Sequence, residues 1–555
     1  MSVGARADRW RTFLPERTVL VAARTVTSST RLLEVLPALF GDDPRVEVLF
    51  GYDSTSAFNG GVLDLLGAHK VRVIGWEEAG EGPCDLVLTA TENASFGHLR
   101  APVLVLPHGV GFHKMVPDAR GPGRRLSGVV PAALLESERS WYAVSHPGQA
   151  GQLAAARPDL AGRTLLVGDP CYDRLLDSRA ARTRYRRALG LQEGDGRRLV
   201  VVSSTWGTQS LIGTVPDLPR RLLAELPLDD YAVAAILHPN VWFGHSPWQI
   251  RTLQRAALDA GLLLIPPFAG WQAAVLAGDI VLGDHGSVTL YAAALGRPVL
   301  LAAFGEESVP GTAMDGLGRR APRLDAAKGL REQIESELAC HRPETAGELA
   351  RLAFQDPGTA LARLRSAVYG LLHLAEPPAP VRRPAAFADP VPERRRDTAQ
   401  VINSVLVREA GAWVIEVRRF PAAARPGREE SDRSFSHLVS DLADGGHGWA
   451  ESASVVTRGD PVSSAEESLR RLAALRHGHP GCALAAVRLP DGGALLLTRD
   501  GRTVRAAGRG EPDDPAVLSA VGYVCLRAGL PMAGAFRVRL GGRAREVSLS
   551  PWPER

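Results

Sequence analysis

The feature that most constrains this chain is a pattern, present twice, in which short apolar runs alternate with amphipathic stretches of helical periodicity. Such alternation is typical of βα units wound around a parallel sheet. In the first half, strands are predicted at Thr18–Ala23, Val46–Leu49, Val71–Ile74, Asp85–Leu88, Val103–Leu106 and Trp141–Val144. In the second half they are predicted at Leu199–Ser203, Ala232–Leu237, Leu262–Ile265, Asp279–Leu282 and Val299–Ala302. The sequence therefore predicts an α/β protein with two tandem Rossmann-like domains and a ligand cleft at their strand ends.

The chain divides into four predicted parts, because its 555 residues exceed the roughly 250 to 300 that one core supports. Residues 1–175 and 176–375 form the two Rossmann-like domains. Residues 376–397 hold six prolines and almost no apolar periodicity, which is typical of a semi-rigid exposed linker. Residues 398–555 contain predicted hairpins and one helix at Asp514–Ala528, which indicate an α+β accessory domain.

Composition excludes several classes of protein. The apolar fraction of 45% and the charged fraction of 23% are ordinary for a globular chain, and a net charge of +4 argues against a nucleic-acid partner. The five cysteines are far apart, so neither a disulfide framework nor a zinc site is indicated. No window approaches the roughly 20 apolar residues of a membrane helix. We expect a cytoplasmic protein, with peripheral contact at the inner membrane face left open.

The first candidate loop follows the strand at Val103–Leu106 and runs from Pro107 to Lys114. His108 leaves a buried strand beside glycines, which suits a general base held close to a ligand. The alternative is that His108 only caps the strand. Lys114 favours function, since only three of the 65 Lys and Arg residues are lysines and an ammonium complements phosphate.

Two further strand ends carry polar side chains. His238 precedes Pro239, which stops the strand and leaves the imidazole at the sheet edge. Ser204 and Thr205 end another strand just before Trp206, a turn suited to phosphate or to a stacked base. Turn-forming hydroxyls are the simpler explanation for Ser204 and Thr205.

The strongest candidate is the stretch from Asp279 to Thr289, in which a strand, a short turn and a helix follow one another. The N–H groups at a helix N-terminus favour an anion. Asp284, Gly286, Ser287 and Thr289 are therefore predicted to help bind phosphate, although an ordinary N-cap serine fits the same pattern. The acidic residues lack the spacing of a two-metal site, so metal-independent chemistry without a cofactor is expected.

The motifs, taken in order, resemble those of the CDP-glycerol glycerophosphotransferases, the GT-B-fold polymerases and primases of teichoic acid synthesis, in a divergent, actinobacterial form. The likeness covers residues 100–305. It rests on five segments: His108-Gly109 with Lys114, Gly168 to Leu175, Ser204-Thr205-Trp206, His238-Pro239, and Asp279 to Ser287. The chain departs from the family pattern at Val110, Ser204, His285 and Gly286.

This resemblance implies an acceptor-side first domain and a donor-binding second domain. His108 would take the proton of an acceptor hydroxyl while His238, Ser287 and Thr289 stabilise charge on the phosphoryl group of a CDP-alditol. The acceptor would be a polyol phosphate or a glycan. Two alternatives remain: a glycosyltransferase that uses a nucleotide sugar, and a catalytically degenerate GT-B scaffold that binds a partner.

Overall fold

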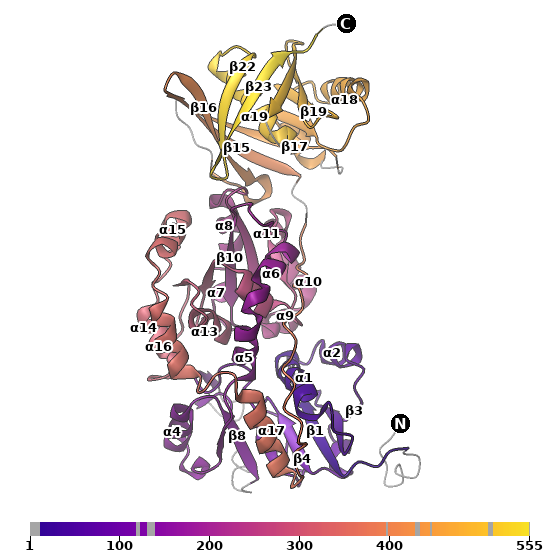
Figure 1. Ribbon diagram of the computed structural model, residues 1–555, viewed down its shortest axis with the longest axis vertical. Helices are drawn as coiled ribbons and strands as arrows, with labels where there is room; N and C mark the ends of the chain where they lie inside the picture. Colours follow the sequence, from indigo (N-terminus) through magenta and orange to yellow (C-terminus); the bar gives the residue numbers. More distant parts are fainter. Residues whose placement is uncertain are drawn as a thin grey trace.

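The computed structural model describes residues 12–117, 123–129, 139–395, 398–427, 433–443, 447–508 and 514–553. It contains two parallel sheets and a barrel, which follow one another along the long axis of the molecule (Figure 1). All eleven strands predicted for the two sheets are confirmed, with ends shifted by one to three residues.

The first sheet is parallel throughout, with strand order β3-β2-β1-β4-β5-β8-β9. Its strands are β1 (Arg17–Ala23), β2 (Val46–Tyr52), β3 (Val73–Gly75), β4 (Leu86–Thr89), β5 (Val103–Val105), β8 (Ser140–Val144) and β9 (Thr164–Leu166). Its helices are α1 (Val26–Phe40), α2 (Val62–Ala68) and α4 (Pro147–Ala156), and a small hairpin is formed by β6 (Met115–Pro117) and β7 (Arg124–Leu126). Successive residues of β1 enter opposite cores, as the two-residue strand period requires: Val19 and Val21 pack on one face, Leu20 and Ala22 on the other.

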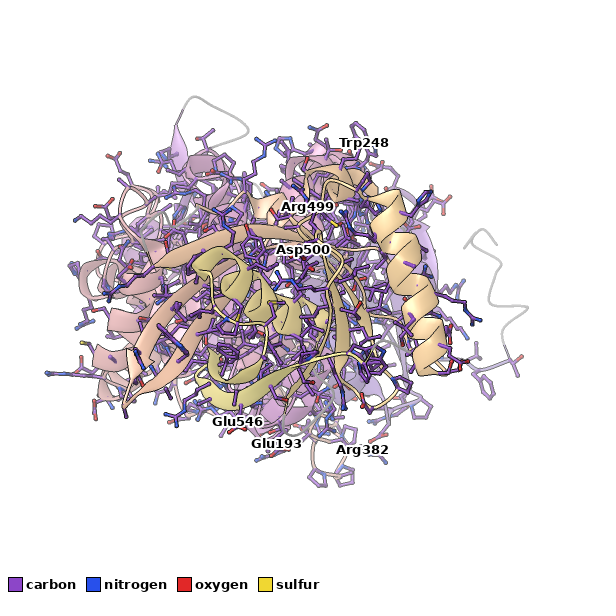
Figure 2. The ribbon with its side chains drawn as sticks, turned by 90° about the horizontal axis from the view of Figure 1, so that it is seen from above. Glu193, Trp248, Arg382, Arg499, Asp500 and Glu546 are labelled. Atoms are coloured by element: carbon purple, nitrogen blue, oxygen red, sulfur yellow. The ribbon has the colours of Figure 1, made fainter. Side chains whose placement is uncertain are left out.

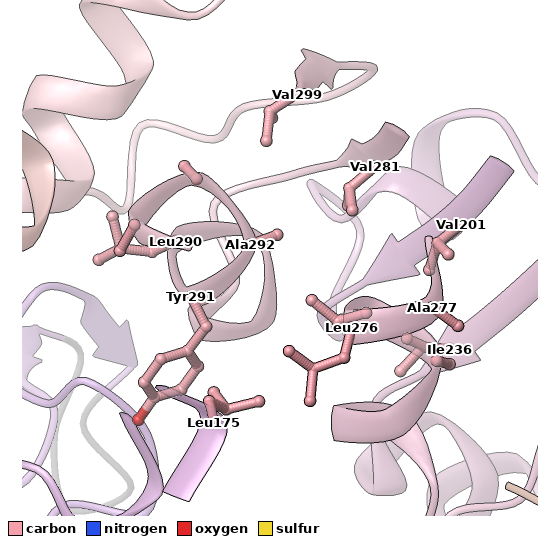
Figure 3. Packing of buried hydrophobic residues seen from close by; sticks show 14 of the residues in the cluster. Leu175, Val201, Ile236, Leu276, Ala277, Val281, Leu290, Tyr291, Ala292 and Val299 are labelled. Carbon is pink, nitrogen blue, oxygen red and sulfur yellow. The ribbon is translucent and has the colours of Figure 1, made fainter. Parts of the chain in front are cut away.

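The second sheet is also parallel, with strand order β12-β11-β10-β13-β14. Its strands are β10 (Arg198–Ser204), β11 (Tyr231–Leu237), β12 (Leu263–Ile265), β13 (Ile280–Gly283) and β14 (Val299–Leu301). The helices around it are α5 (Pro170–Asp177), α6 (Arg182–Ala188), α7 (Leu211–Thr214), α8 (Leu218–Glu225), α9 (Pro239–His245), α10 (Pro247–Leu253), α11 (Arg255–Asp259), α12 (Trp271–Ala277), α13 (Ser287–Ala294), α14 (Ala313–Arg320), α15 (Leu330–Cys340) and α16 (Glu344–Ala353). Figure 3 shows one face of this core, where Val201, Ile236 and Val281 of the sheet face Leu276 of α12 and Leu290 of α13.

One helix departs from sequence order. α17 (Ala360–Leu371) follows the second sheet in the chain but packs beside α1 on the first domain (Figure 1). Its side chains Leu364, Val368 and Tyr369 are buried in the same core as β1 and β4. The chain therefore crosses from the first domain to the second and back again.

The proline-rich segment that follows is mostly exposed, as expected, but it is docked on the body of the protein at a few points. Phe387 is buried in the core of the second domain, and its carbonyl accepts hydrogen bonds from Tyr185 and Arg184. Glu393 pairs with Leu264 of β12 through two backbone hydrogen bonds. Burial of one aromatic side chain is enough to attach this segment, because its prolines already hold the backbone extended.

The C-terminal domain is a closed barrel of nine strands, so the expected α+β arrangement is corrected. The strands are β15 (Ala399–Glu409), β16 (Ala412–Pro421), β17 (Ser434–Asp441), β18 (Val455–Arg458), β19 (Leu484–Arg488), β20 (Ala494–Thr498), β21 (Thr503–Gly508), β22 (Gly534–Leu540) and β23 (Arg543–Pro551). The predicted helix is confirmed as α19 (Pro515–Ala528). It is buried on every side from Pro515 to Cys525, among side chains of the barrel strands. A second helix, α18 (Ala465–Gly478), packs outside on β19 and β20. Figure 2, seen from the barrel end, shows Arg499 and Asp500 at the turn between β20 and β21.

Candidate functional site

The candidate site lies where the carboxyl ends of the two parallel sheets approach each other. The loop after β5 contacts two loops of the second domain. The N–H of Met115 donates to the Glu307 carbonyl at 2.7 Å, and the N–H of Val309 donates to the His113 carbonyl at 2.9 Å. The N–H of Val110 donates to Ser287 Oγ at 3.3 Å. Residues far apart in the sequence are thus brought to one place.

His108 is exposed at the end of β5 and its ring is oriented by one hydrogen bond. Nδ1 lies 3.2 Å from the carbonyl oxygen of Ala90. Because a carbonyl only accepts, the neutral ring carries its hydrogen on Nδ1 and keeps a lone pair on Nε2. This orientation leaves Nε2 free to accept a proton.

His238 is fixed in the opposite tautomer. It caps α9, and its Nδ1 accepts a hydrogen bond from the N–H of Asn240 at 3.1 Å. Burial lowers the pKa of His238 to about 3, and the positive charges of His108 and Lys114 act in the same direction. The ring is therefore neutral near pH 7 and carries its hydrogen on Nε2, where it acts as a donor. His238 can therefore cap α9 through Nδ1 and also donate to a ligand through Nε2.

Lys114 is held at the cleft by a carboxylate of the second domain. Its Nζ lies 2.7 Å from Glu307 Oε2 and 5.1 Å from the centroid of the Trp206 ring. The same carboxylate oxygen lies 3.2 Å from Nε2 of His285, whose Nδ1 accepts from the N–H of Gly305. Burial opposes ionisation of Glu307, but its contact with Lys114 holds the pKa of Glu307 below its ordinary value. Glu307 thus joins the Lys114 ammonium of the first domain to the His285 imidazole of the second.

Asp284 is completely buried and organises the second domain's part of the site. Its carboxylate accepts N–H hydrogen bonds from Thr205 at 2.8 Å, Leu211 at 2.8 Å and Gly286 at 3.0 Å. Burial raises the pKa of Asp284, while these N–H groups oppose the rise. The Asp284 carboxylate therefore connects the loop after β10 to the loop after β13 and fixes their relative position.

The hydroxyl groups predicted to bind phosphate are placed differently from one another. Thr289 is fully buried and its Oγ1 accepts from the N–H of Asp284 at 3.2 Å. Ser204 donates to the Thr205 carbonyl at 3.0 Å and accepts from the N–H of Ile212 at 3.0 Å. By contrast, Gly286 and Ser287 are partly exposed at the N-terminus of α13. Ser287 and the helix N-terminus are therefore accessible, whereas the side chains of Thr289 and Ser204 are buried.

Two acidic residues of the site escaped the sequence analysis. Glu307 lies in the loop after β14, and Glu92 lies in the loop after β4. Glu92 pairs with Arg125 at 3.0 Å. Burial opposes its ionisation, yet the charges of Arg125 and then His108 hold the pKa of Glu92 below its ordinary value. The sequence offered one signal that could have found them: both residues lie in loops that follow the carboxyl end of a parallel strand.

Two further observations apply to the described residues alone. Within them, no group of three or more His, Cys, Asp or Glu side chains is arranged to hold a metal ion. No helix in the same ranges combines the length and apolarity needed to cross a bilayer.

The fold is that of a mixed α/β protein with two Rossmann-like parallel sheets. No family model matches the chain, and no curated protein matches it. Among solved structures, the wall teichoic acid polymerase TagF is similar at 13% identity with a TM-score of 0.43, covering 65% of this chain and 89% of that one. The S. aureus MnaA–UDP structure is similar at 12% identity and a TM-score of 0.41, covering 67% and 100%. The UDP-GlcNAc 2-epimerase from Neisseria meningitidis bound to UDP-GlcNAc gives 14% identity and a TM-score of 0.40, covering 64% and 100%.

Proposed function

We propose that this chain is a GT-B-type transferase that moves an alditol-phosphate group, glycerophosphate-like, from a CDP-linked donor to an acceptor hydroxyl. The observation that carries the proposal is the pair of opposite tautomers at the cleft. His108 presents a lone pair on Nε2, and His238 presents an N–H on Nε2. A base and a neutral hydrogen-bond donor are the two groups that this reaction needs from the protein. The ordered motifs that resemble the glycerophosphotransferases support the same reaction.

The reaction can be written on these residues with atoms in balance. The acceptor oxygen attacks the β-phosphorus of the donor, and the bond between this phosphorus and the oxygen that bridges to CMP breaks. His108 Nε2 takes the proton of the acceptor hydroxyl, and CMP leaves with the bridging oxygen. His238 donates its Nε2–H to the phosphoryl oxygens as negative charge redistributes.

The donor diphosphate would be bound by the N-terminus of α13 and by Lys114. The first N–H groups of a helix lack intrahelical acceptors, and the helix dipole favours an anion there. Ser287 Oγ accepts from Val110, so its own hydrogen remains available to a phosphate oxygen. Lys114 would add an ammonium donor, oriented by Glu307, whose carboxylate offsets part of its charge.

Replacing the base tests the assignment of His108. We expect His108→Ala to lower turnover by about 10² to 10⁴-fold, the range of general base catalysis, and to leave the donor dissociation constant within a few-fold. His69→Ala, which removes an exposed histidine of the first domain, serves as the matched control. A His108→Ala enzyme that turns over normally would remove His108 from the mechanism.

The donor and the bond that breaks are tested together. Calorimetry with CDP-glycerol, CDP-ribitol and UDP-glucose identifies the nucleotide, and Ser287→Ala is expected to weaken binding while Ser54→Ala is not. Product analysis then separates the reactions, because release of CMP indicates phosphoryl transfer and release of a nucleoside diphosphate indicates glycosyl transfer. Binding of none of these donors would favour a GT-B scaffold that has lost catalysis.

A further inference from the structure

A cavity lies at the edge of the second sheet where the strands begin, opposite to the edge that carries the candidate site. It has a volume of about 790 Å³ and lies between the second domain and the barrel. Tyr231 and Leu263, which begin β11 and β12, form part of its wall, and Gly541 in the turn between β22 and β23 closes the barrel side. The candidate site is at the carboxyl ends of the same strands, so the two sites are separated by the length of the sheet.

Cationic side chains dominate the lining of this cavity. Six arginines line it: Arg197, Arg394, Arg395, Arg419, Arg543 and Arg545. They come from the second domain, the docked segment before the barrel, and the barrel itself. Only two acidic side chains, Asp195 and Asp229, are among the lining residues. The cavity therefore carries an excess of positive charge contributed by three parts of the chain.

Some of this charge is neutralised within the protein. Arg419 pairs with Asp229 at 2.6 Å, and Arg197 pairs with Asp195 at 3.0 Å. Arg395 pairs with Asp259 at 2.6 Å. These pairs hold the cavity walls in place and consume both of the acidic lining residues.

Two of the arginines have no carboxylate partner among the described residues. Arg394 is exposed and lies against Gly190, where a methyl group would meet its Nη1 at 3.1 Å. Arg543 donates to the backbone carbonyl of Gly194. Guanidinium groups that are not paired with acids are available for bidentate hydrogen bonds to phosphate oxygens.

The rest of the cavity is apolar. Leu189, Leu223, Leu228 and Val233 line it beside Tyr231. A volume of about 790 Å³ falls within the range of small-molecule sites, and the combination of apolar walls with a few cationic groups selects a ligand that has both characters. Leu189, Leu223 and Val233 present only a small part of their surface to the cavity, because they are buried in the cores of the second domain, whereas Leu228 is partly exposed.

We propose that this cavity binds an organic polyphosphate of the nucleoside polyphosphate class, with its phosphates at Arg394 and Arg543 and its ring system against the leucine-rich wall. Such a ligand would contact the second domain, the docked segment and the barrel at once. Its binding would therefore strengthen the attachment of the barrel to the catalytic body, whatever reaction the candidate site performs.

Calorimetric titration of the full chain with ATP tests the proposal, with adenosine and inorganic pyrophosphate as partial probes. We expect ATP to bind more tightly than either fragment, because each fragment satisfies only one wall of the cavity. The double variant Arg394→Ala/Arg543→Ala is expected to weaken ATP binding at least tenfold, since one charge-assisted hydrogen bond is worth about that factor. Arg382→Ala/Arg499→Ala removes the same charge from exposed positions that do not line the cavity and should change binding less than twofold; both residues are labelled in Figure 2.

A comparison with the candidate site keeps this proposal separate from the proposed function. The variant Ser287→Ala/His238→Ala should bind ATP like the unmodified chain. If this variant loses ATP binding while the arginine variant retains it, ATP occupies the donor site and the proposal is wrong. Absence of ATP binding at millimolar concentration would also overturn it. Hydrogen exchange that slows on ATP addition at residues 394–395 and 541–545, and not at 284–289, would support it.

Discussion

Burial holds three histidines of this protein in their neutral form. It lowers the pKa of His113 to about 4 and the pKa values of His238 and His437 to about 3. His437 is the most isolated of them, because neither ring nitrogen has a hydrogen-bond partner among the described residues. Its ring stacks on Tyr523 of α19 with centroids 4.1 Å apart. His437 therefore contributes to the packing of the barrel as a neutral aromatic ring and not through hydrogen bonds.

This isolation predicts an acid-sensitive barrel. The unfolded chain binds a proton at His437 below its ordinary pKa of 6.5, whereas the folded chain does so only near pH 3, so stability falls as the pH drops below 6.5. At pH 5 the loss is about 2 kcal/mol relative to pH 8. We expect His437→Phe to remove this share of the pH dependence, and His477→Phe, at an exposed position of α18, to leave it unchanged. Hydrogen exchange of β17 and α19 at the two pH values measures the difference. An unchanged pH dependence in His437→Phe would contradict the argument.

At the level of single residues, the sequence indicated which residues lie at strand ends and helix starts, but not the direction in which their side chains point. His108, His238 and Ser287 could be selected because each directly follows a buried strand or begins a helix. The sequence could not show that the Thr289 hydroxyl turns inward to the N–H of Asp284, because this depends on the packing of α13. Nor could it show that Glu307 binds Lys114 across 193 positions, because nothing local to either residue encodes the contact.

Among the elements, the close approach of two loops determines the geometry of the candidate site. Gly109 lies so near the start of α13 that an added Cβ would be 2.4 Å from Ser287 Oγ and 2.9 Å from Ser287 Cβ. Ser287 also accepts the hydrogen bond of Val110. The absence of a side chain at Gly109 thus lets the His108 loop and the helix N-terminus share one site.

A pair of substitutions tests whether this approach matters. We expect Gly109→Ala to weaken donor binding or lower turnover by about tenfold or more, because a displacement of the loop by about 1 Å is costly to a positioned base. In the background of Ser287→Gly, which removes the obstructing atoms, the same change should have less than a twofold effect. Donor titration and steady-state kinetics on the four proteins give the coupling. Equal effects in both backgrounds would show that the contact with Ser287 is not the cause.

The elements were predictable where their signals are local. The parallel strands are short apolar runs, and each hairpin turn carries at least one glycine, so both could be located. The edge strand β9 was not predicted: its apolar run is only three residues long, from Leu165 to Val167, and its strand residues are partly buried or exposed. Closure of the barrel was missed for a different reason: it depends on the parallel pairing of β16 with β22, which joins segments far apart in sequence.

On the scale of the whole molecule, a buried charged network joins the two parallel domains. Arg31 of α1 donates to Tyr291 Oη at 3.2 Å, and the Tyr291 hydroxyl donates to Asp169 at 2.6 Å. Arg31 also lies 3.8 Å from the Asp169 carboxylate. Asp169 caps α5 at the same time, through the N–H groups of Cys171 and Tyr172. The junction between the domains is thus held by charge as well as by packing.

Removing the charge of Asp169 tests the strength of this junction. Asp169→Asn keeps an oxygen to cap α5 but leaves the buried Arg31 with only the carboxylate of Glu34, at 3.9 Å, so we expect a loss of about 3 kcal/mol in the free energy of unfolding. Adding Arg31→Met removes the stranded cation and should recover part of the loss. Urea unfolding of the two single variants and the double variant, followed at its first transition, measures both effects. Additive losses in the double variant would show that the two groups do not depend on each other.

The return of α17 to the first domain has a consequence for synthesis. When residues 1–175 have emerged from the ribosome, Leu364, Val368 and Tyr369 have not yet been synthesised. These side chains fill the core beneath α1. The first domain to emerge therefore stays incomplete until the second has been translated almost to its end, against the usual order in which domains fold as they appear. A chain interrupted anywhere between 175 and 360 would expose the unfilled face of α1 to chaperones and proteases. Finishing the second domain is, in this protein, the step that also finishes the first.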